Sequence, residues 1–363
     1  MHLEIDLLRR IGLSQATLAQ LGQELTAPEG NQPLASPDGT RLMRVIETQR
    51  DRHTLHDGRD EHVARLMPAV HHALQARDDQ LTIGDWVLAG NDAHGDAWIV
   101  ARIAPLTQIA RRANDGRRQP LASNVDTAVL VMGLDADFNP RRMERYIAMV
   151  RASGVAPVAV LSKVDLGPEA RHRADQLRER LPKDVPIVAV DGTRPAARLE
   201  LQPWLGVGQT LVLLGSSGAG KSTLTNTLLR AATQQTGDVR LGDGRGRHTT
   251  TARSLHLCGD GACIIDSPGL RTWRPDADGQ ALAATFDDVQ ALAQGCRYRD
   301  CRHEGEPGCA VRDEVPEDRL RNYQKLLRDA ERGDRTPLQR IALRQKWKRL
   351  GKAGSQRVAE KRR

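Results

Sequence analysis

The chain contains the run Gly215-Ser216-Ser217-Gly218-Ala219-Gly220-Lys221-Ser222, a complete G-x-x-x-x-G-K-S motif. An apolar run, residues 210–214, precedes this motif, and a helical pattern beginning at Thr223 follows it. This order is the one that a phosphate-binding loop requires, whereas a glycine-rich turn without a ligand does not need it. In such a loop the backbone N–H groups surround the phosphates, Lys221 reaches the terminal ones and the Ser222 hydroxyl ligates Mg²⁺.

Two further segments match the switches of a nucleotide hydrolase. Asp266-Ser267-Pro268-Gly269 follows a short apolar run. This predicts that Asp266 holds Mg²⁺ through water and that the N–H of Gly269 senses the γ-phosphate. The basic stretch 244–251 ends in three threonines and is typical of a first switch, in which one threonine, assigned here to Thr250, completes the Mg²⁺ shell. Without its neighbours this stretch would be interpreted as a plain loop.

A guanine-reading motif of the form Asn/Thr-Lys-x-Asp is absent from its usual place, because residues 272–294 contain no lysine. A similar motif lies upstream of the phosphate loop, at Ser162-Lys163-Val164-Asp165, directly after the apolar run 157–161. The carboxylate of Asp165 would accept from both N1–H and the 2-amino group of guanine, and the stem of Lys163 would stack along the base. So short a motif, taken alone, also fits a surface turn.

The order of the motifs predicts a circularly permuted G domain, because the base reader precedes the phosphate loop and both switches. Apolar strand-like runs alternate with helical stretches, which indicates a parallel sheet covered by helices. These runs are residues 127–132, 157–161, 185–190, 210–214 and 263–266. Ligands bind at the carboxyl ends of such strands whatever the chain order, so permutation preserves the site. The second switch then leads directly into the C-terminal region.

The regions on either side of the G domain predict a multidomain protein. A helix is expected over residues 5–21, followed by a mobile Pro- and Gly-rich stretch. Short β-like runs at 42–47, 82–89 and 97–104 favour a five-stranded oligonucleotide-binding (OB-like) barrel, although an SH3-like barrel or a sandwich fits nearly as well. We expect an N-terminal extension (1–40), a barrel (41–112) with a basic linker at its end, a G domain (113–280), a helical zinc-knuckle domain (281–335) and a basic tail (336–363).

The C-terminal region carries a cluster of metal-ligating residues in the pattern C-x₄-C-x-H-x₅-C. The residues are Cys296, Cys301, His303 and Cys309. Three cysteines and one histidine suit a closed, tetrahedral structural Zn²⁺ site. The nearby glutamates are not needed, because four preferred ligands already fill the shell. Cys258 and Cys263 flank a turn and are expected to be hairpin thiols.

Composition narrows the classes of partner. The chain has 363 residues and a formal net charge of +8, which favours phosphate-rich partners such as RNA or DNA. No apolar run approaches a membrane span, and the first ten residues lead into no secretory signal, so a cytoplasmic location is expected. Residues 340–363 contain ten Lys or Arg, one acidic residue and Trp347. This segment fits either a solvated tail or a segment ordered by RNA.

Together these motifs resemble the bacterial ribosome small-subunit-dependent GTPase A family, with a likeness that covers roughly residues 41–335. In that family an OB barrel precedes a permuted G domain and a zinc-bearing C-terminal domain. The resemblance implies a GTPase that binds the small (30S) ribosomal subunit and its rRNA late in subunit maturation, with hydrolysis stimulated by the subunit. We also expect the protein to be a monomer. It also implies that Ser162, Lys163 and Asp165 hold the base and residues 215–223 the phosphates.

The chain departs from the family pattern at two positions near the base. Ser162 replaces the commoner asparagine, and Val190-Asp191 stands where a Ser-Ala pair is expected, before Gly192. Weaker guanine affinity would follow from these changes.

The hydrolytic water needs a positioning group, because Leu270 stands where small GTPases carry a glutamine. His248 is the candidate catalytic residue, since an imidazole can hydrogen-bond water. The alternative is that His248 is a solvent-exposed histidine on a basic loop with no catalytic role. Two other functions remain open at this stage. One is a nucleotide-gated RNA-binding module with incidental hydrolysis, and the other is an ATP-dependent nucleic-acid enzyme.

Overall fold

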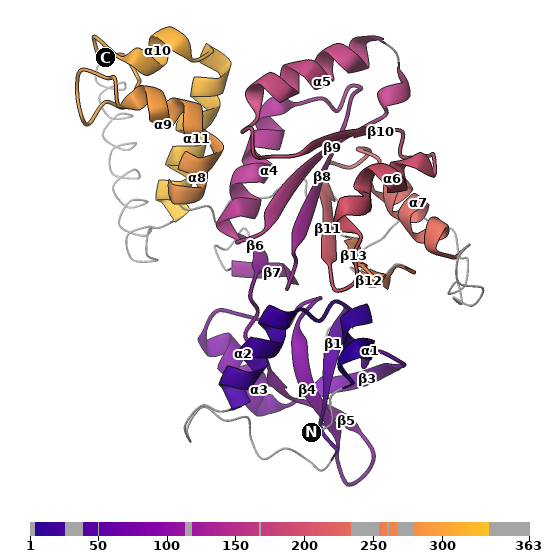
Figure 1. The fold of residues 1–363 in the computed structure, drawn as a ribbon. Helices are drawn as coiled ribbons and strands as arrows, with labels where there is room; N and C mark the ends of the chain where they lie inside the picture. Colours follow the sequence, from indigo (N-terminus) through magenta and orange to yellow (C-terminus); the bar gives the residue numbers. More distant parts are fainter. Residues whose placement is uncertain are drawn as a thin grey trace, which may run out of the picture.

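The computed structural model has a β-barrel, a central α/β unit and a C-terminal group of helices, which follow one another along the chain (Figure 1). It describes residues 4–25, 39–49, 51–112, 118–166, 168–233, 254–259, 261–266 and 279–333. Within these ranges no helix is both long and apolar enough to cross a bilayer.

The barrel is built from β1 (Arg41–Thr48), β2 (His53–His56), β3 (Glu61–Leu66), β4 (Trp86–Asn91) and β5 (Ala97–Arg102). Strands β1, β2 and β3 pair in sequence, β3 pairs in parallel with β5, and β5 pairs with β4. Strand β4 then returns to pair with β1, so the hydrogen bonds close into a ring. This closure confirms the predicted OB-like barrel and excludes an open sandwich. Helix α3 (Pro68–Ala76) connects β3 to β4.

The predicted helix over residues 5–21 is wrong as a single element. The chain forms α1 (Ile5–Arg10) and α2 (Gln15–Leu25), separated at Gly12, whose φ is +89°. Ser14 starts the second helix, because its hydroxyl accepts from the N–H of Thr17 at 3.1 Å. Both helices cover the barrel and share its apolar core. The Pro- and Gly-rich stretch predicted to be mobile lies outside the described residues.

Arg44 of β1 joins the barrel to its surroundings from a fully buried position. Its guanidinium donates to the carbonyl of Ile11 at 2.5 Å and to that of Asn124 at 3.0 Å. A Cβ at Gly12 would lie 1.8 Å from Arg44 Nη1, which explains why the break between the two N-terminal helices is a glycine. One side chain therefore ties together α1, the barrel and the start of the G domain.

Both ends of the segment predicted as a basic linker lie in paired strands. Strands β6 (Gln108–Arg112) and β7 (Arg118–Ser123) pair antiparallel. The expected domain boundary at residue 112 thus falls within a paired element. These strands contain several arginines and glutamines, so they lack the alternation of apolar and polar residues by which a strand is predicted from sequence.

The central sheet has the spatial order β10-β9-β8-β11-β13-β12. Its strands are β8 (Thr127–Gly133), β9 (Ala156–Ser162), β10 (Ile187–Val190), β11 (Thr210–Gly215), β12 (Ser254–Leu257) and β13 (Cys263–Asp266). All pairings are parallel except that of β12 with β13, and the strands predicted from the apolar runs are confirmed. Strand β12 also pairs with β1 at Ser254 and Glu47, so the barrel and the sheet are continuous.

Helices cover both faces of this sheet (Figure 1). Helices α4 (Pro140–Ala152) and α5 (Pro168–Arg180) pack on one face, and α6 (Ala196–Leu201) and α7 (Lys221–Thr233) on the other. The short helices η1 (Val164–Leu166) and η2 (Gln202–Trp204) lie in the connections. The chain runs outward from β8 to β10 on one side and from β11 to β13 on the other, so the strand order reverses between β8 and β11. The crevice at such a reversal is where ligands bind in open α/β sheets.

The C-terminal unit consists of α8 (Gly279–Thr285), α9 (Asp287–Ala293), α10 (Ala310–Glu314) and α11 (Glu317–Gly333). Its core surrounds Phe286 and includes Ala148 of α4, so this unit packs directly on the G domain. Helices and the Cys/His cluster share one small domain, as the sequence predicted. The basic tail lies outside the described residues.

A buried ion network joins α4 to the C-terminal unit. Glu144 is completely buried, and its carboxylate accepts from Arg180 Nε and Asn322 Nδ2, each at 2.6 Å. Arg319 of α11 also donates to Glu144 and reaches Asp288 at 2.7 Å and 2.8 Å. The buried carboxylate accepts from Arg319, which is also buried, and from Arg180, which is less buried. Its loss would remove one of the two carboxylate partners of each guanidinium group.

We expect Glu144→Ala to lower the free energy of unfolding by about 3 kcal/mol, since removing one partner of a buried ion pair is strongly destabilising. Urea denaturation followed by circular dichroism measures the change. Asp175→Ala is the matched control, because Asp175 pairs with Arg178 on the exposed surface of α5, and it should cost less than about 0.5 kcal/mol. Equal effects of the two variants would contradict the assigned role of Glu144.

Candidate nucleotide site and metal centre

The predicted phosphate loop lies between β11 and α7, at the reversal of the sheet. Gly215 pairs with Val131 of β8, and a Cβ at Gly215 would lie 2.3 Å from the Val131 carbonyl oxygen. Gly218 and Gly220 have backbone φ values of +86° and +94°, which residues other than glycine rarely adopt. The loop therefore needs its glycines for two reasons, close strand packing at the first and backbone turns at the others.

Lys221 is buried at the start of α7, and its Nζ donates to the carbonyl oxygens of Gly215 at 3.0 Å and Ser216 at 2.7 Å. Burial lowers the pKa of Lys221, and the carboxylates of Asp266 and Asp137 oppose that shift. The ammonium group thus spans its own loop, close to the first-turn N–H groups of α7, which have no partner within the helix. This combination suits the binding of an anion. Ser222 and Thr223 are exposed in that first turn.

Asp266 ends β13, the strand that pairs with β11 on the side away from β8. Burial raises the pKa of Asp266, while His256 and Lys221 act in the opposite direction. The carboxylate therefore lies close to the phosphate loop, at the edge where the sequence predicted a Mg²⁺ ligand. The other predicted switch residues, His248, Thr250 and Gly269, lie outside the described residues, as does Leu270.

The upstream motif folds against the phosphate loop although it precedes the loop in the chain. Ser162 ends β9, and its hydroxyl donates to the carbonyl of Ala219 at 2.6 Å. Lys163 has a φ of +61°, and its Nζ donates to the Gly218 carbonyl at 2.8 Å. Asp165 is exposed in η1. The serine that departs from the family pattern is therefore used as a direct tie between the two motifs.

Two acidic residues that the sequence analysis did not identify stand between these motifs. Asp135 and Asp137 lie in the loop from β8 to α4. Asp135 accepts from Lys163 Nζ at 2.6 Å, and Asp137 accepts from the Ser216 hydroxyl at 2.6 Å. In the sequence both acids follow directly after an apolar run that forms β8. This position indicates a functional site only once β8 is known to pair with β11, the strand that carries the phosphate loop.

The loop at Val190-Asp191, which departs from the family pattern, lies beside α7. Asp191 accepts from the N–H and hydroxyl of Thr193 at 3.0 and 2.6 Å, so its carboxylate is used within its own turn. The carbonyl of Gly192 accepts from the Thr227 hydroxyl of α7 at 2.7 Å. This loop is therefore anchored to the helix that begins at Lys221.

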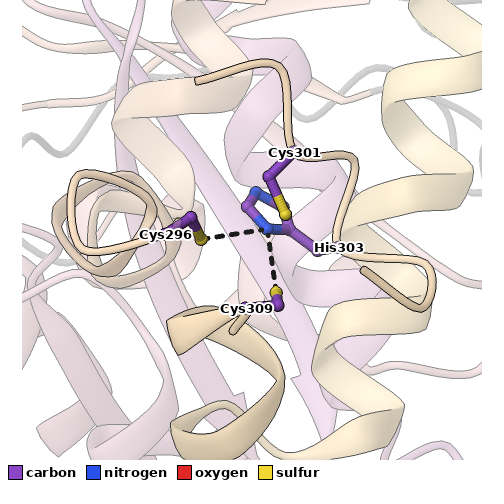
Figure 2. Close-up of side chains that lie close together, drawn as sticks. All are labelled: Cys296, Cys301, His303 and Cys309. Carbon is purple, nitrogen blue, oxygen red and sulfur yellow. Dashed lines mark hydrogen bonds between the residues drawn. The ribbon is translucent and has the colours of Figure 1, made fainter. Parts of the chain in front are cut away.

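The Cys/His cluster converges on one point, as Figure 2 shows. The potential ligand atoms of Cys296, Cys301, His303 and Cys309 all lie within 4.8 Å of one another. His303 Nδ1 is 3.7 Å from Cys296 Sγ and 3.3 Å from Cys309 Sγ. Ligands of a tetrahedral Zn²⁺ stand about 3.5 to 4 Å apart, so the spacing fits a metal ion.

Neighbouring polar groups support the cluster without joining it. The Glu306 carboxylate accepts from the N–H groups of Arg302, Glu304 and Gly305, and these backbone hydrogen bonds lower its pKa to about 2. Cys258 and Cys263 lie at the β12–β13 hairpin, as predicted, where burial raises the pKa of their thiols to about 12 and about 11. Neither belongs to the metal-binding group found among the described residues.

Comparisons with known proteins agree with this arrangement. Residues 103–275 match the family described as RsgA GTPase. The chain is 39% identical over 322 residues to the Small ribosomal subunit biogenesis GTPase RsgA 2 of Vibrio vulnificus (strain CMCP6), covering 86% of this chain and 88% of that protein. It is 43% identical over 291 residues to the Small ribosomal subunit biogenesis GTPase RsgA of Xanthomonas oryzae pv. oryzae (strain MAFF 311018), covering 78% and 79% of the two chains.

Solved structures share the fold. The crystal structure of YjeQ from Thermotoga maritima superposes with a TM-score of 0.59 at 22% identity, covering 82% of this chain and 100% of that chain. The structure of YloQ, titled a circularly permuted GTPase, gives a TM-score of 0.57 at 18% identity and covers 82% and 98%. At these identities the likeness concerns the fold alone.

We expect Gly215→Ala to lower the free energy of unfolding by about 1 to 3 kcal/mol, because the added methyl group must push β11 away from β8. Binding of a fluorescent GTP analogue should weaken in the same variant. Gly22→Ala serves as the control, since no atom outside the backbone of α2 lies within 4 Å of the added Cβ, and it should be neutral or stabilising. Unchanged stability and binding in Gly215→Ala would contradict the close packing.

Proposed function

Since this chain belongs to the RsgA GTPase family, we propose that it binds the small (30S) ribosomal subunit, assists its late maturation and hydrolyses GTP faster when bound to it. The observation that carries the proposal is the contact between Ser162-Lys163 and the phosphate loop through Ala219 and Gly218. The contact between the proposed guanine reader and the phosphate loop would bring both within reach of one nucleotide, which supports a GTPase over an ATP-dependent enzyme.

Each motif residue has a proposed role in this pocket. Asp165 reads the guanine, while Ser162 and Lys163 tie the base-reading loop to the phosphate loop. Residues 215–223 bind the phosphates, with Lys221 as the terminal-phosphate cation and Ser222 as a Mg²⁺ ligand. Bound Mg²⁺ would neutralise phosphate charge, with Asp266 and Thr250 completing its surroundings and the N–H of Gly269 sensing the γ-phosphate.

The residues expected at the hydrolytic site explain why fast GTP hydrolysis would depend on a partner. Leu270 can neither accept a proton nor hold a water, so the free enzyme lacks the usual positioning group. We assign the water-positioning role to His248, which lies in the first switch. Binding to the subunit would bring the imidazole to the water, so that turnover rises only on the ribosome.

The surface of the zinc-knuckle domain suits a nucleic-acid partner. Arg297, Arg299, Arg302 and Arg312 are exposed around the Cys/His cluster. Tyr298 is 43% exposed, and Arg297 lies over its ring at 5.6 Å. Cations that contact phosphates, next to an aromatic ring that can stack on a base, favour single-stranded or looped rRNA. In this proposal the ion in the cluster is one structural Zn²⁺, the GTPase is monomeric, and it acts in the cytoplasm, where bacterial ribosomes assemble.

GTP turnover, measured with and without purified 30S subunits, tests the proposal. The wild-type rate should rise when subunits are added and should not rise with 50S subunits. His248→Ala should lower the stimulated rate by about 10²-fold or more, the scale of a positioned acid–base group. His94→Ala, a change in an exposed turn of the barrel, is the control. Equal turnover with and without 30S subunits would favour an RNA-binding module with incidental hydrolysis.

Metal analysis tests the cluster. We expect one tightly bound Zn²⁺ per chain, and Cys301→Ser should lose it and loosen the C-terminal helices, because metal binding and folding are coupled. Cys258→Ala removes a cysteine outside the cluster and should retain the metal. A wild-type protein that contains no zinc after purification without chelator would refute the assignment.

A further inference from the structure

The loop from β8 to α4, residues 134–139, contacts both halves of the GTP pocket. Its Asp135 carboxylate accepts from Lys163 Nζ at 2.6 Å, and its Asp137 carboxylate accepts from the Ser216 hydroxyl at 2.6 Å. Lys163 belongs to the base-reading loop and Ser216 to the phosphate loop. One short segment therefore holds two motifs that are far apart in the chain.

Both carboxylates are themselves fixed. Asp137 accepts from the Gly133 N–H at 3.2 Å and pairs with the guanidinium of Arg142 at 2.5 Å. The N–H of Asp137 donates to Asp135 Oδ1 at 3.1 Å, which links the two acids. Arg173 of α5 donates to the Asp135 carbonyl at 2.8 Å. Because their own partners hold them, these acids can orient the groups that they contact.

Lys163 needs such an anchor. Its φ of +61° is unfavourable for a residue with a side chain, and Lys163 is about one-third exposed. The hydrogen bond from Lys163 holds the pKa of Asp135 below its ordinary value, which shows that the ionised carboxylate favours this contact. The ammonium group is thereby directed to Asp135 on one side and to the Gly218 carbonyl, at 2.8 Å, on the other.

Ser216 has an equivalent need. It follows Gly215, and its carbonyl is one of the two that accept from Lys221. Its hydroxyl points to Asp137, which also contributes to the electrostatic surroundings of Lys221. Because the loop is held at Ser216, Lys221 is already oriented toward the phosphates before GTP binds. Such preorganisation lowers the entropy cost of binding and so increases the affinity for GTP.

We propose that Asp135 and Asp137 are positioning residues for GTP, with Asp135 holding Lys163 at the base-reading loop and Asp137 holding Ser216 at the phosphate loop. This inference rests on the proposed GTP pocket and adds a third segment to it. Neither acid contacts a reacting atom in this arrangement. Their loss should therefore raise KM and Kd for GTP more than it lowers kcat at saturating GTP.

The experiment measures the Kd of a fluorescent GTP analogue and the basal KM and kcat of the full-length protein. We expect Asp135→Ala and Asp137→Ala each to raise Kd by about tenfold, the lower range for a hydrogen bond to a charged group, since the Lys163 pair is partly exposed. Asp175→Ala, which removes a carboxylate from an exposed pair on α5, should leave Kd unchanged.

Double-mutant cycles separate positioning from a general loss of stability. Combining Asp137→Ala with Ser216→Ala, and Asp135→Ala with Lys163→Ala, should raise Kd no further than the larger single effect, because each pair acts as a unit. Asn variants should restore part of the affinity, because an amide oxygen can still accept. If an Ala variant does not fold, the corresponding Asn variant provides the comparison with wild type.

The outcomes distinguish this inference from the proposed function. Wild-type Kd in folded Asp135→Ala and Asp137→Ala, or fully additive cycles, would overturn the positioning role while leaving the GTP pocket intact. If the wild-type protein fails to bind GTP, or if Asp165→Asn does not change the preference between GTP and xanthosine triphosphate, the proposed pocket itself fails.

Discussion

The parallel pairing of β8 with β11 is the constraint on which the remaining structure depends. It places the first strand of the permuted domain beside the strand that carries the phosphate loop, and it does so through a glycine, since only Gly215 can approach Val131 so closely. All chemistry at the carboxyl edge follows from this neighbour relation. The loop after β8 meets the loop after β11, and the base-reading loop after β9 lies one strand further along.

Permutation changes which segments connect the G domain to its neighbours while it leaves the pocket intact. The barrel precedes β8 and also pairs with the sheet through β12, next to the strand that ends at Asp266. The C-terminal helices follow the region of the second switch and pack on α4. Both neighbours therefore contact elements that lead directly to the nucleotide. This is an arrangement in which the occupancy of the proposed pocket can affect the surfaces proposed to bind rRNA.

Two buried charged residues hold these neighbours in place. Arg44 connects the barrel to α1 and to Asn124, and Glu144 connects α4 to the C-terminal helices. Burying a charge is unfavourable unless its partners are well oriented, so each residue tolerates only one arrangement of the elements around it. Loss of either charge would leave polar groups of the neighbouring elements without these partners.

The sequence alone determined the motifs, their order and hence the permuted G domain, and the Cys/His cluster, because each depends on residues close together in the chain or on local strand and helix patterns. It left the N-terminal β region open between an OB-like barrel, an SH3-like barrel and a sandwich, and the closing pair of β1 with β4 excluded the sandwich. It missed the split between α1 and α2, the pairing of β6 with β7, and the contacts of Asp135 and Asp137 with the two motifs. The helix break at Gly12 is required by the close approach of the distant Arg44, and the two acids accept hydrogen bonds from Lys163 and Ser216. Only the tertiary structure decides such features, because strand pairing between distant segments selects which side chains meet.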